Sequence, residues 1–142
     1  MVIPDANILL YATDQNCADH ETALAWWSET LQAGDEVGLS AVVAFAFVRL
    51  STNRRVFLQP LSVKDACARV ENWLEFPNVT WLDSKAEDFA TASQLLETAG
   101  TAGNLTTDAH IAAIAQRIGG TVISCDQDFA RFPGINRRDP LR

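Results

Sequence analysis

The chain has 142 residues, of which 48% are hydrophobic and 20% are charged, a composition typical of a globular protein and not of a disordered one. This length predicts a single domain over residues 1–142. No apolar run approaches the roughly 18 residues that a membrane-spanning helix needs. The first residues also lack the basic segment of a secretion signal, so we expect a cytoplasmic protein without membrane contact.

The net charge of −7 does not match the basic surplus of a conventional nucleic-acid binder. The charge is unevenly distributed, because residues 101–142 carry 4 acidic and 5 basic side chains whereas residues 1–100 carry 14 and 6. A metal bound to the late acids would therefore leave the C-terminal end locally positive. The three cysteines, Cys17, Cys67 and Cys125, have no zinc-site or disulfide spacing, so we expect small buried thiols in a reducing compartment.

The first half of the chain predicts short strands alternating with helices. A strand at Val2 and Ile3 ends at Pro4, because proline cannot donate a ladder hydrogen bond and fits only a strand end. The apolar spacing then predicts, in chain order, a short helix over 8–12, a helix over 21–33, a strand over 37–39, a helix over 40–52 and a loop over 53–61. The helix over 40–52 is apolar nearly all round, so we expect it to be buried.

The second half continues this alternation. Ser62 with Asp65 and Ser84 with Glu87 resemble capping boxes, and each pair starts a helix. In chain order, the pattern predicts a helix ending before Pro77, a strand over 79–82, a helix ending at Gly100 with Phe89 on its apolar face, a helix capped by Thr106 or Thr107, a strand over 121–125, a turn or short helix over 126–132 and an extended piece at 135. Together these elements predict an α/β fold with a parallel sheet covered by helices on both faces.

Aspartates occur at the points where this topology places ligands. Asp5 and Asp126 follow two predicted strands, and Asp108 lies in the first turn of the helix that leads into the second of them. Because the carboxyl ends of parallel strands meet at one edge of the sheet, we expect all three carboxylates at that edge. Asp128, two residues beyond Asp126, is placed to join them.

Clustered carboxylates repel one another, which raises their pKa values and favours a divalent cation. Oxygen ligands prefer Mg²⁺ or Mn²⁺ to zinc, and such a site suits metal-assisted hydrolysis of phosphodiesters. The same residues also have a purely structural interpretation, in which Asp108 caps a helix and Asp128 belongs to a turn. His20 and His110 are isolated, so we interpret them as structural or solvated residues.

Five segments carry a family resemblance that extends over essentially the whole chain. They are VIPDANILLYA, HETALAWW, FVRLSTNRRVF, GNLTTDAHIAAIA and TVISCDQDFARFPG, in this order. In sequence and spacing they resemble the PIN domain family, in particular the VapC toxins of type II toxin–antitoxin modules. The resemblance implies a three-layer α/β/α sandwich with a central, mainly parallel sheet, a Mg²⁺- or Mn²⁺-dependent ribonuclease site, and silencing by a VapB antitoxin.

The resemblance also implies roles for single residues. By position, Asp5, Asp108 and Asp126 match the family's metal-binding acids, and Asp128 matches a further acid of the catalytic set. Asn7 and Thr107 match polar residues that support the site.

One position departs from the family pattern. The family usually places a glutamate in the helix over 40–52, about three residues before an arginine. Here Ala46 precedes Arg49, and no acid occurs in that helix. The departure implies weaker metal binding, heavier use of Asp128, or lost activity.

These observations predict a metal-dependent endoribonuclease that acts as the toxin of a toxin–antitoxin pair. We expect RNA as substrate, a VapB-like antitoxin, and a homodimer that uses Trp26 or Trp27 and the apolar helix over 40–52. The basic side chains expected to meet RNA phosphates are Arg131, Arg137 and Arg138. Two alternatives stay open: a catalytically degenerate PIN-like module that binds nucleic acid or protein, and a phosphatase-type enzyme with a strand-end aspartate. Against the latter, the DAN motif lacks a second acid two residues after Asp5.

Overall fold

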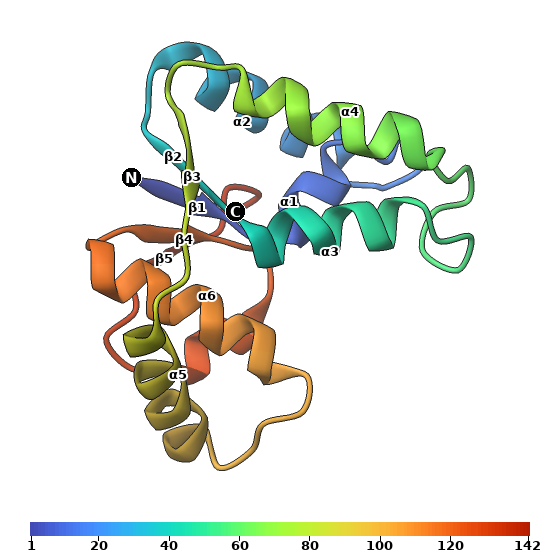
Figure 1. Ribbon diagram of the computed structural model, residues 1–142. Coiled ribbons are helices and arrows are strands. Elements are labelled where there is room, and N and C mark those ends of the chain that lie inside the picture. Colours follow the sequence, from blue (N-terminus) through green and yellow to red (C-terminus); the bar gives the residue numbers. More distant parts are fainter.

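Five short strands form one parallel sheet in the computed structural model of the chain, which describes residues 1–142 (Figure 1). The strands are β1 (Val2–Pro4), β2 (Val37–Ser40), β3 (Val79–Leu82), β4 (Thr121–Ile123) and β5 (Arg137–Arg138), in the spatial order β3-β2-β1-β4-β5. Pro4 is the last residue of the central strand, as its missing donor requires.

The register of the sheet brings three polar residues level with one another. Val2 of β1 pairs with Val37 of β2 and with Thr121 of β4. Continuing this register by three residues places Asp5 level with Ser40 on one side and Ser124 on the other. The carboxyl edge of the sheet is therefore polar at its centre.

Helices cover both faces of the sheet. One face carries α1 (Ala6–Tyr11), α2 (His20–Ala33), α3 (Ala41–Ser51) and α4 (Val63–Leu74), and the other carries α5 (Ala86–Ala99) and α6 (Leu105–Ile118) (Figure 1). A 3₁₀ helix, η1 (Gln127–Arg131), connects β4 to β5. This arrangement confirms the predicted three-layer α/β/α fold with a parallel sheet. No helix is long and apolar enough to cross a membrane.

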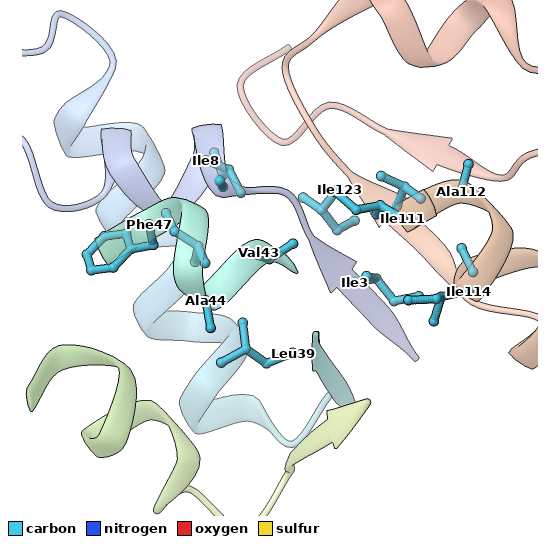
Figure 2. Packing of buried hydrophobic residues seen from close by; sticks show 14 of the residues in the cluster. Ile3, Ile8, Leu39, Val43, Ala44, Phe47, Ile111, Ala112, Ile114 and Ile123 are labelled. Carbon is cyan, nitrogen blue, oxygen red and sulfur yellow. The ribbon is translucent and has the colours of Figure 1, made fainter. Parts of the chain in front are cut away.

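The hydrophobic core lies on both sides of the sheet. On the α3 side, Leu39, Val43 and Phe47 pack together, and on the α6 side Ile3 and Ile123 meet a row of helix residues (Figure 2). That row consists of Ile111, Ala112 and Ile114, each 1% exposed or less. The small side chain of Ala112 lets the helix approach the strands closely, which fixes the position of the first turn of α6 relative to the sheet edge.

Several helices differ from the sequence predictions in the face they bury. Helix α3 is not buried all round, since Phe45 is 72% exposed and only the stripe with Val43 and Phe47 is fully buried, while Val42, Ala46, Val48 and Leu50 pack against the core with partial exposure. Phe89 of α5 is likewise 79% exposed, because Ala92 and Leu95 form the buried face instead. Of the adjacent tryptophans, Trp27 is buried, and Trp26 stacks on it and packs against the core with partial exposure. The cysteines are free thiols, but partly rather than fully buried.

Helix starts also differ where a side chain has a stronger partner. The predicted Ser84–Glu87 capping box is wrong: the backbone N–H of Lys85 donates to the carboxylate of Asp88, and the Ser84 hydroxyl pairs with Nε2 of His110 at 2.9 Å. Helix α6 begins at Leu105, so neither Thr106 nor Thr107 is its N-cap. The hydroxyl of Ser62 does cap α4, accepting a hydrogen bond from the backbone N–H of Asp65.

The start of α5 is tied to α6 by a buried ion pair. Asp88 is 1% exposed and accepts two hydrogen bonds from Arg117, at 2.7 and 3.1 Å. These hydrogen bonds from the guanidinium hold the pKa of Asp88 below its ordinary value despite burial. The pair therefore fixes α5 against α6.

We predict that Asp88→Asn lowers the free energy of unfolding by about 1.5–3 kcal/mol at pH 7, because it removes the charged acceptor of two hydrogen bonds from the partly buried guanidinium of Arg117. The matched variant Glu87→Gln removes an exposed carboxylate 3.9 Å from the same arginine and should cost less than about 0.5 kcal/mol. Urea denaturation measures both. Since the pKa of Asp88 is lowered on folding, the stabilisation by its carboxylate should persist down to about pH 4 and disappear only below it. Equal costs for the two variants would contradict this role.

Candidate metal centre

Three carboxylates lie together beyond the carboxyl edge of the sheet. Asp108 from the first turn of α6, Asp126 before η1 and Asp128 within η1 each contribute an oxygen, and these oxygens all lie within 4.8 Å of one another. All three residues are partly exposed, so solvent and ligands can reach them. Elements far apart in the sequence thus form one acidic group.

The geometry of η1 places two of these acids. Oδ1 of Asp126 accepts a hydrogen bond from the backbone N–H of Asp128 at 2.8 Å, which caps the 3₁₀ helix. This turn directs two carboxylates only two residues apart to the same side. The turn interpretation and the ligand interpretation of Asp126 and Asp128 are therefore compatible.

Asp5 adjoins the group from the centre of the sheet and is the most buried of the four acids, at 6% exposed. Its Oδ1 accepts from the backbone N–H of Ala6 at 2.7 Å, and its Oδ2 accepts from the hydroxyl of Ser124 at 2.9 Å. The same Ser124 oxygen accepts from the backbone N–H of Asp126 at 3.0 Å. One buried hydroxyl thus links the first acid to the loop that carries the later ones.

The electrostatics of the site show that the four acids interact. Burial, followed by the charges of Asp5, Asp126 and Asp128, raises the pKa of Asp108 to about 7. The pKa of Asp5 is also raised, chiefly by burial and to a smaller extent by Asp126, although its hydrogen bonds to Ser124 and Ala6 act in the opposite direction. The site therefore carries negative charge that no side chain of the protein neutralises, since no lysine or arginine forms an ion pair with these acids.

The donor set fits a hard divalent cation. It consists only of carboxylate oxygens, is open to solvent and has an excess of negative charge that a cation would relieve, which is the chemistry that Mg²⁺ and Mn²⁺ select. Asp108, Asp126 and Asp128 form the closest group, with Asp5 beside them. The oxygens of Asp5 already accept hydrogen bonds, which fix the orientation of this carboxylate.

The remaining predicted site residues lie around this centre. Thr107 is exposed and precedes Asp108. Asn7 forms no hydrogen bond with Asp5 and lines a separate depression of about 410 Å³ with Tyr11 and Phe57. Thr107 is thus next to Asp108 in the chain, and the Asn7 side chain lines a different depression from Thr107.

The three arginines predicted as RNA contacts differ in their surroundings. Arg137 donates to the backbone carbonyl of Asp126 at 2.9 Å and so braces the η1 loop. Arg131 donates to the carbonyl of Ala99 at 3.2 Å. Arg138 lines a depression near Trp26 and Asp139.

Ala46 is the residue at which this chain departs from the family pattern. It lines a depression of about 540 Å³ beside α3, together with Thr107 of α6. A longer side chain at position 46 would therefore have room to enter this depression. No acidic residue lines it.

Sequence reasoning missed Ser124 and Ser40. Ser124 is fully buried and links Asp5 to Asp126, and Ser40 is 1% exposed with a hydroxyl that has no hydrogen-bond partner. The feature of the sequence that could have identified them is a hydroxyl side chain at the end of an otherwise apolar strand. Parallel pairing makes such residues neighbours of a strand-end aspartate.

Comparisons with known proteins agree with this geometry. Residues 2–135 match the family model of the PIN domain. The chain is 41% identical to ribonuclease VapC33 of Mycobacterium tuberculosis, over 100% of this chain and 99% of that protein. It is 36% identical to ribonuclease VapC37 of the same species, over 99% of this chain and 97% of that protein.

Solved structures with the same fold include VapC20 of Mycobacterium tuberculosis, described as a sarcin–ricin loop cleaving toxin, with a TM-score of 0.72 at 20% identity over 96% of this chain and 99% of that one. Another is the VapBC-1 structure from nontypeable Haemophilus influenzae, with a TM-score of 0.70 at 17% identity over the whole of both chains. The sheet order, the acids at its carboxyl edge and the match over nearly the full length lead to one assignment. The chain belongs to the PIN domain family.

Proposed function

We propose that this protein is a metal-dependent endoribonuclease, the toxin of a toxin–antitoxin pair, with residues 1–142 acting as a single PIN-like domain. The observation that carries the proposal is the group of four interacting aspartates at the carboxyl edge of the sheet. The ribonuclease names of the relatives at 41% and 36% identity support RNA as the substrate.

Each acid has a proposed task. Asp5 and Asp108 hold the cation, directly or through water, and Asp126 contributes a further oxygen. Asp128, together with Asp126, completes the acidic pocket and orients the attacking water. A bound Mg²⁺ or Mn²⁺ would supply charge neutralisation and Lewis-acid activation for hydrolysis of the phosphodiester. Without a cation, the clustered carboxylates would repel the phosphate of the substrate.

The partners are part of the proposal. A VapB-like antitoxin is supported by the VapBC complexes among the proteins that share this fold. A homodimer is supported by the exposed aromatic side chains of Phe45 and Phe89 on α3 and α5, since large apolar groups on a surface favour association. A cytoplasmic location is supported by the three free thiols.

One alternative to a nuclease is supported by an observation. A PIN-like module that binds without catalysis fits the absence of an acid at Ala46. A phosphatase with Asp5 as nucleophile fits less well, because both oxygens of that carboxylate accept hydrogen bonds and only 6% of the residue is exposed.

We predict that Asp108→Asn and Asp5→Asn each reduce RNA cleavage by at least about 100-fold, since even outer partners of metal ligands are worth about 10–100-fold. Gel assays on structured RNAs with Mg²⁺, Mn²⁺ or EDTA measure the effect. Glu71→Gln, which removes an exposed carboxylate from α4, is the control for loss of one charge. Cleavage that persists in EDTA or in both variants would refute the assigned site, and a wild type that neither binds metal nor cleaves would favour the non-catalytic module.

The raised pKa of Asp108 predicts a pH-dependent cost in the metal-free protein. Above about pH 7 the carboxylate is charged in both folded and unfolded chains, and folding then forces the charge into the acidic group. Below about pH 4 it is neutral in both states, and the cost is absent. Asp108→Asn in EDTA should therefore raise the melting temperature most above pH 7 and hardly at all near pH 4.

The same melting curves contain a test of the metal. Adding Mg²⁺ at pH 8 should stabilise the wild type and leave Asp108→Asn nearly unchanged. A gain that is independent of pH, or equal stabilisation of both proteins by Mg²⁺, would show that Asp108 is not a charged ligand of the site.

We predict that Ala46→Glu tightens Mn²⁺ binding by about tenfold, because an added carboxylate increases the ligand charge of a hard-cation site. The open depression beside Thr107 gives the longer side chain room. Isothermal titration with Mn²⁺ measures the change, and Ala68→Glu on α4 adds the same charge away from the acids. Unchanged or weaker binding by Ala46→Glu would show that α3 does not face the cation.

A further inference from the structure

Three arginines gather where α3 ends. Arg49 lies in the last turn of the helix, and Arg54 and Arg55 follow in the turn after it. With Thr52 and Asn53 they line a depression of about 690 Å³ that contains no hydrophobic side chain. We call these three residues the arginine turn.

The backbone of the arginine turn is held in place. Oδ1 of Asn53 accepts from the backbone N–H of Arg55 at 2.8 Å, and the Asn53 carbonyl accepts from Val56 and Phe57 at 3.0 and 2.9 Å. The ring of Phe57 is buried in the core. The turn therefore presents its cations from a fixed backbone, so binding a ligand orders little more than side chains.

The guanidinium groups of the arginine turn have no partner within the protein. All three residues are exposed, and none forms an ion pair or a side-chain hydrogen bond. This contrasts with Arg117 and Arg137, whose donors are used internally. Three unpaired arginines in one depression of a protein with net charge −7 form a local site for an anion of high charge density.

One side of α3 leads from the arginine turn to Thr107, the residue before Asp108. Arg49 lines both the polar depression and the depression of about 540 Å³ that reaches Thr107, which precedes Asp108. From Val42 to Arg49 the helix rises by about 10 Å. In Figure 1, α3 extends away from the strands and ends in the loop that carries the turn.

We propose that the arginine turn binds the phosphate backbone of the RNA substrate on one side of the scissile bond. Guanidinium groups suit this task, because their fork of donors matches two phosphate oxygens. Contacts to phosphate position a nucleic acid without reading its sequence. The inference rests on the proposed ribonuclease function. It assigns the positioning of the substrate to the three arginines at the end of α3 that lies away from the sheet.

The test compares RNA affinity and its salt dependence. Fluorescence anisotropy of a labelled, single-stranded 2′-O-methyl RNA, whose integrity is checked on a gel after each titration, is measured in Mg²⁺ between about 50 and 200 mM salt. Arg49→Gln/Arg54→Gln/Arg55→Gln should weaken binding at least tenfold at the lower salt. Its slope of log affinity against log salt should become less steep by about 2, since each phosphate contact with a single strand contributes about 0.7.

A matched control removes charge from another exposed surface. Lys64→Gln/Arg69→Gln deletes two exposed cations on α4, and we compare it with Arg54→Gln/Arg55→Gln. The control should keep the wild-type slope, whereas the turn variant should lose about 1.4 of it. Melting curves of all variants should coincide, because none of these side chains has an internal partner.

Two results would overturn the inference: unchanged RNA binding by the triple variant, or equal losses in the two double variants. Unchanged RNA binding together with lost binding of polyglutamate would assign the turn to an acidic polypeptide instead. Binding does not require cleavage, so a wild type that cleaves no RNA but binds it through the turn would support this inference and refute the proposed nuclease activity.

Discussion

Partial burial of several carboxylates together at the centre of the sheet edge is the constraint on which the site depends. Four acids from three separate segments lie together, and burial, followed by their mutual repulsion, raises the pKa of Asp108 to about 7. The fold holds Asp5 in this environment with two hydrogen bonds, one of them from Ser124, which also anchors the loop before Asp126. Such a concentration of negative charge without internal counter-ions is the observation that supports the proposed cation site.

Helix α3 extends from the polar edge of the sheet to the positively charged arginine turn. Its first turn starts directly after β2, and its last turn carries Arg49. The acidic group and the arginine turn are thus separated by one helix whose exposed face holds Ala46 and Phe45. In our proposal, a cation held by Asp5, Asp108 and Asp126 would neutralise the acidic group, and the arginines hold a neighbouring part of the RNA backbone, so that an acidic protein could act on RNA.

Much of the fold could be predicted from the sequence, because strand and helix spacings repeat clearly, and the strand-end aspartates predicted the edge of the sheet at which the acids gather. Asp5 shows this best, since a carboxylate directly after a short apolar strand has few structural explanations. The faces of α3 and α5 could not be predicted, because apolar residues such as Phe45 and Phe89 satisfy the helical spacing while lying outside the core. The predicted Ser84–Glu87 capping box was wrong, because Asp88 accepts the hydrogen bond at the start of α5 instead. Arg117, 29 residues away in the sequence, holds Asp88 in this position.

Residues whose role depends on the register between strands also could not be identified from the sequence. Nothing local distinguishes Ser124 from an ordinary strand serine until parallel pairing places it level with Asp5. The arginine turn had a local signal in two adjacent arginines, but only the structure adds Arg49 to them and shows that all three lack partners.

The most direct test of the central claim is anomalous diffraction from crystals of the protein grown with Mn²⁺. Our account predicts a peak beside the carboxylates of Asp5, Asp108 and Asp126, within direct or water-mediated reach, and no such peak in crystals of Asp108→Asn. Saturating Mn²⁺ without a peak at these aspartates, or with its only peak elsewhere on the molecule, would contradict the account.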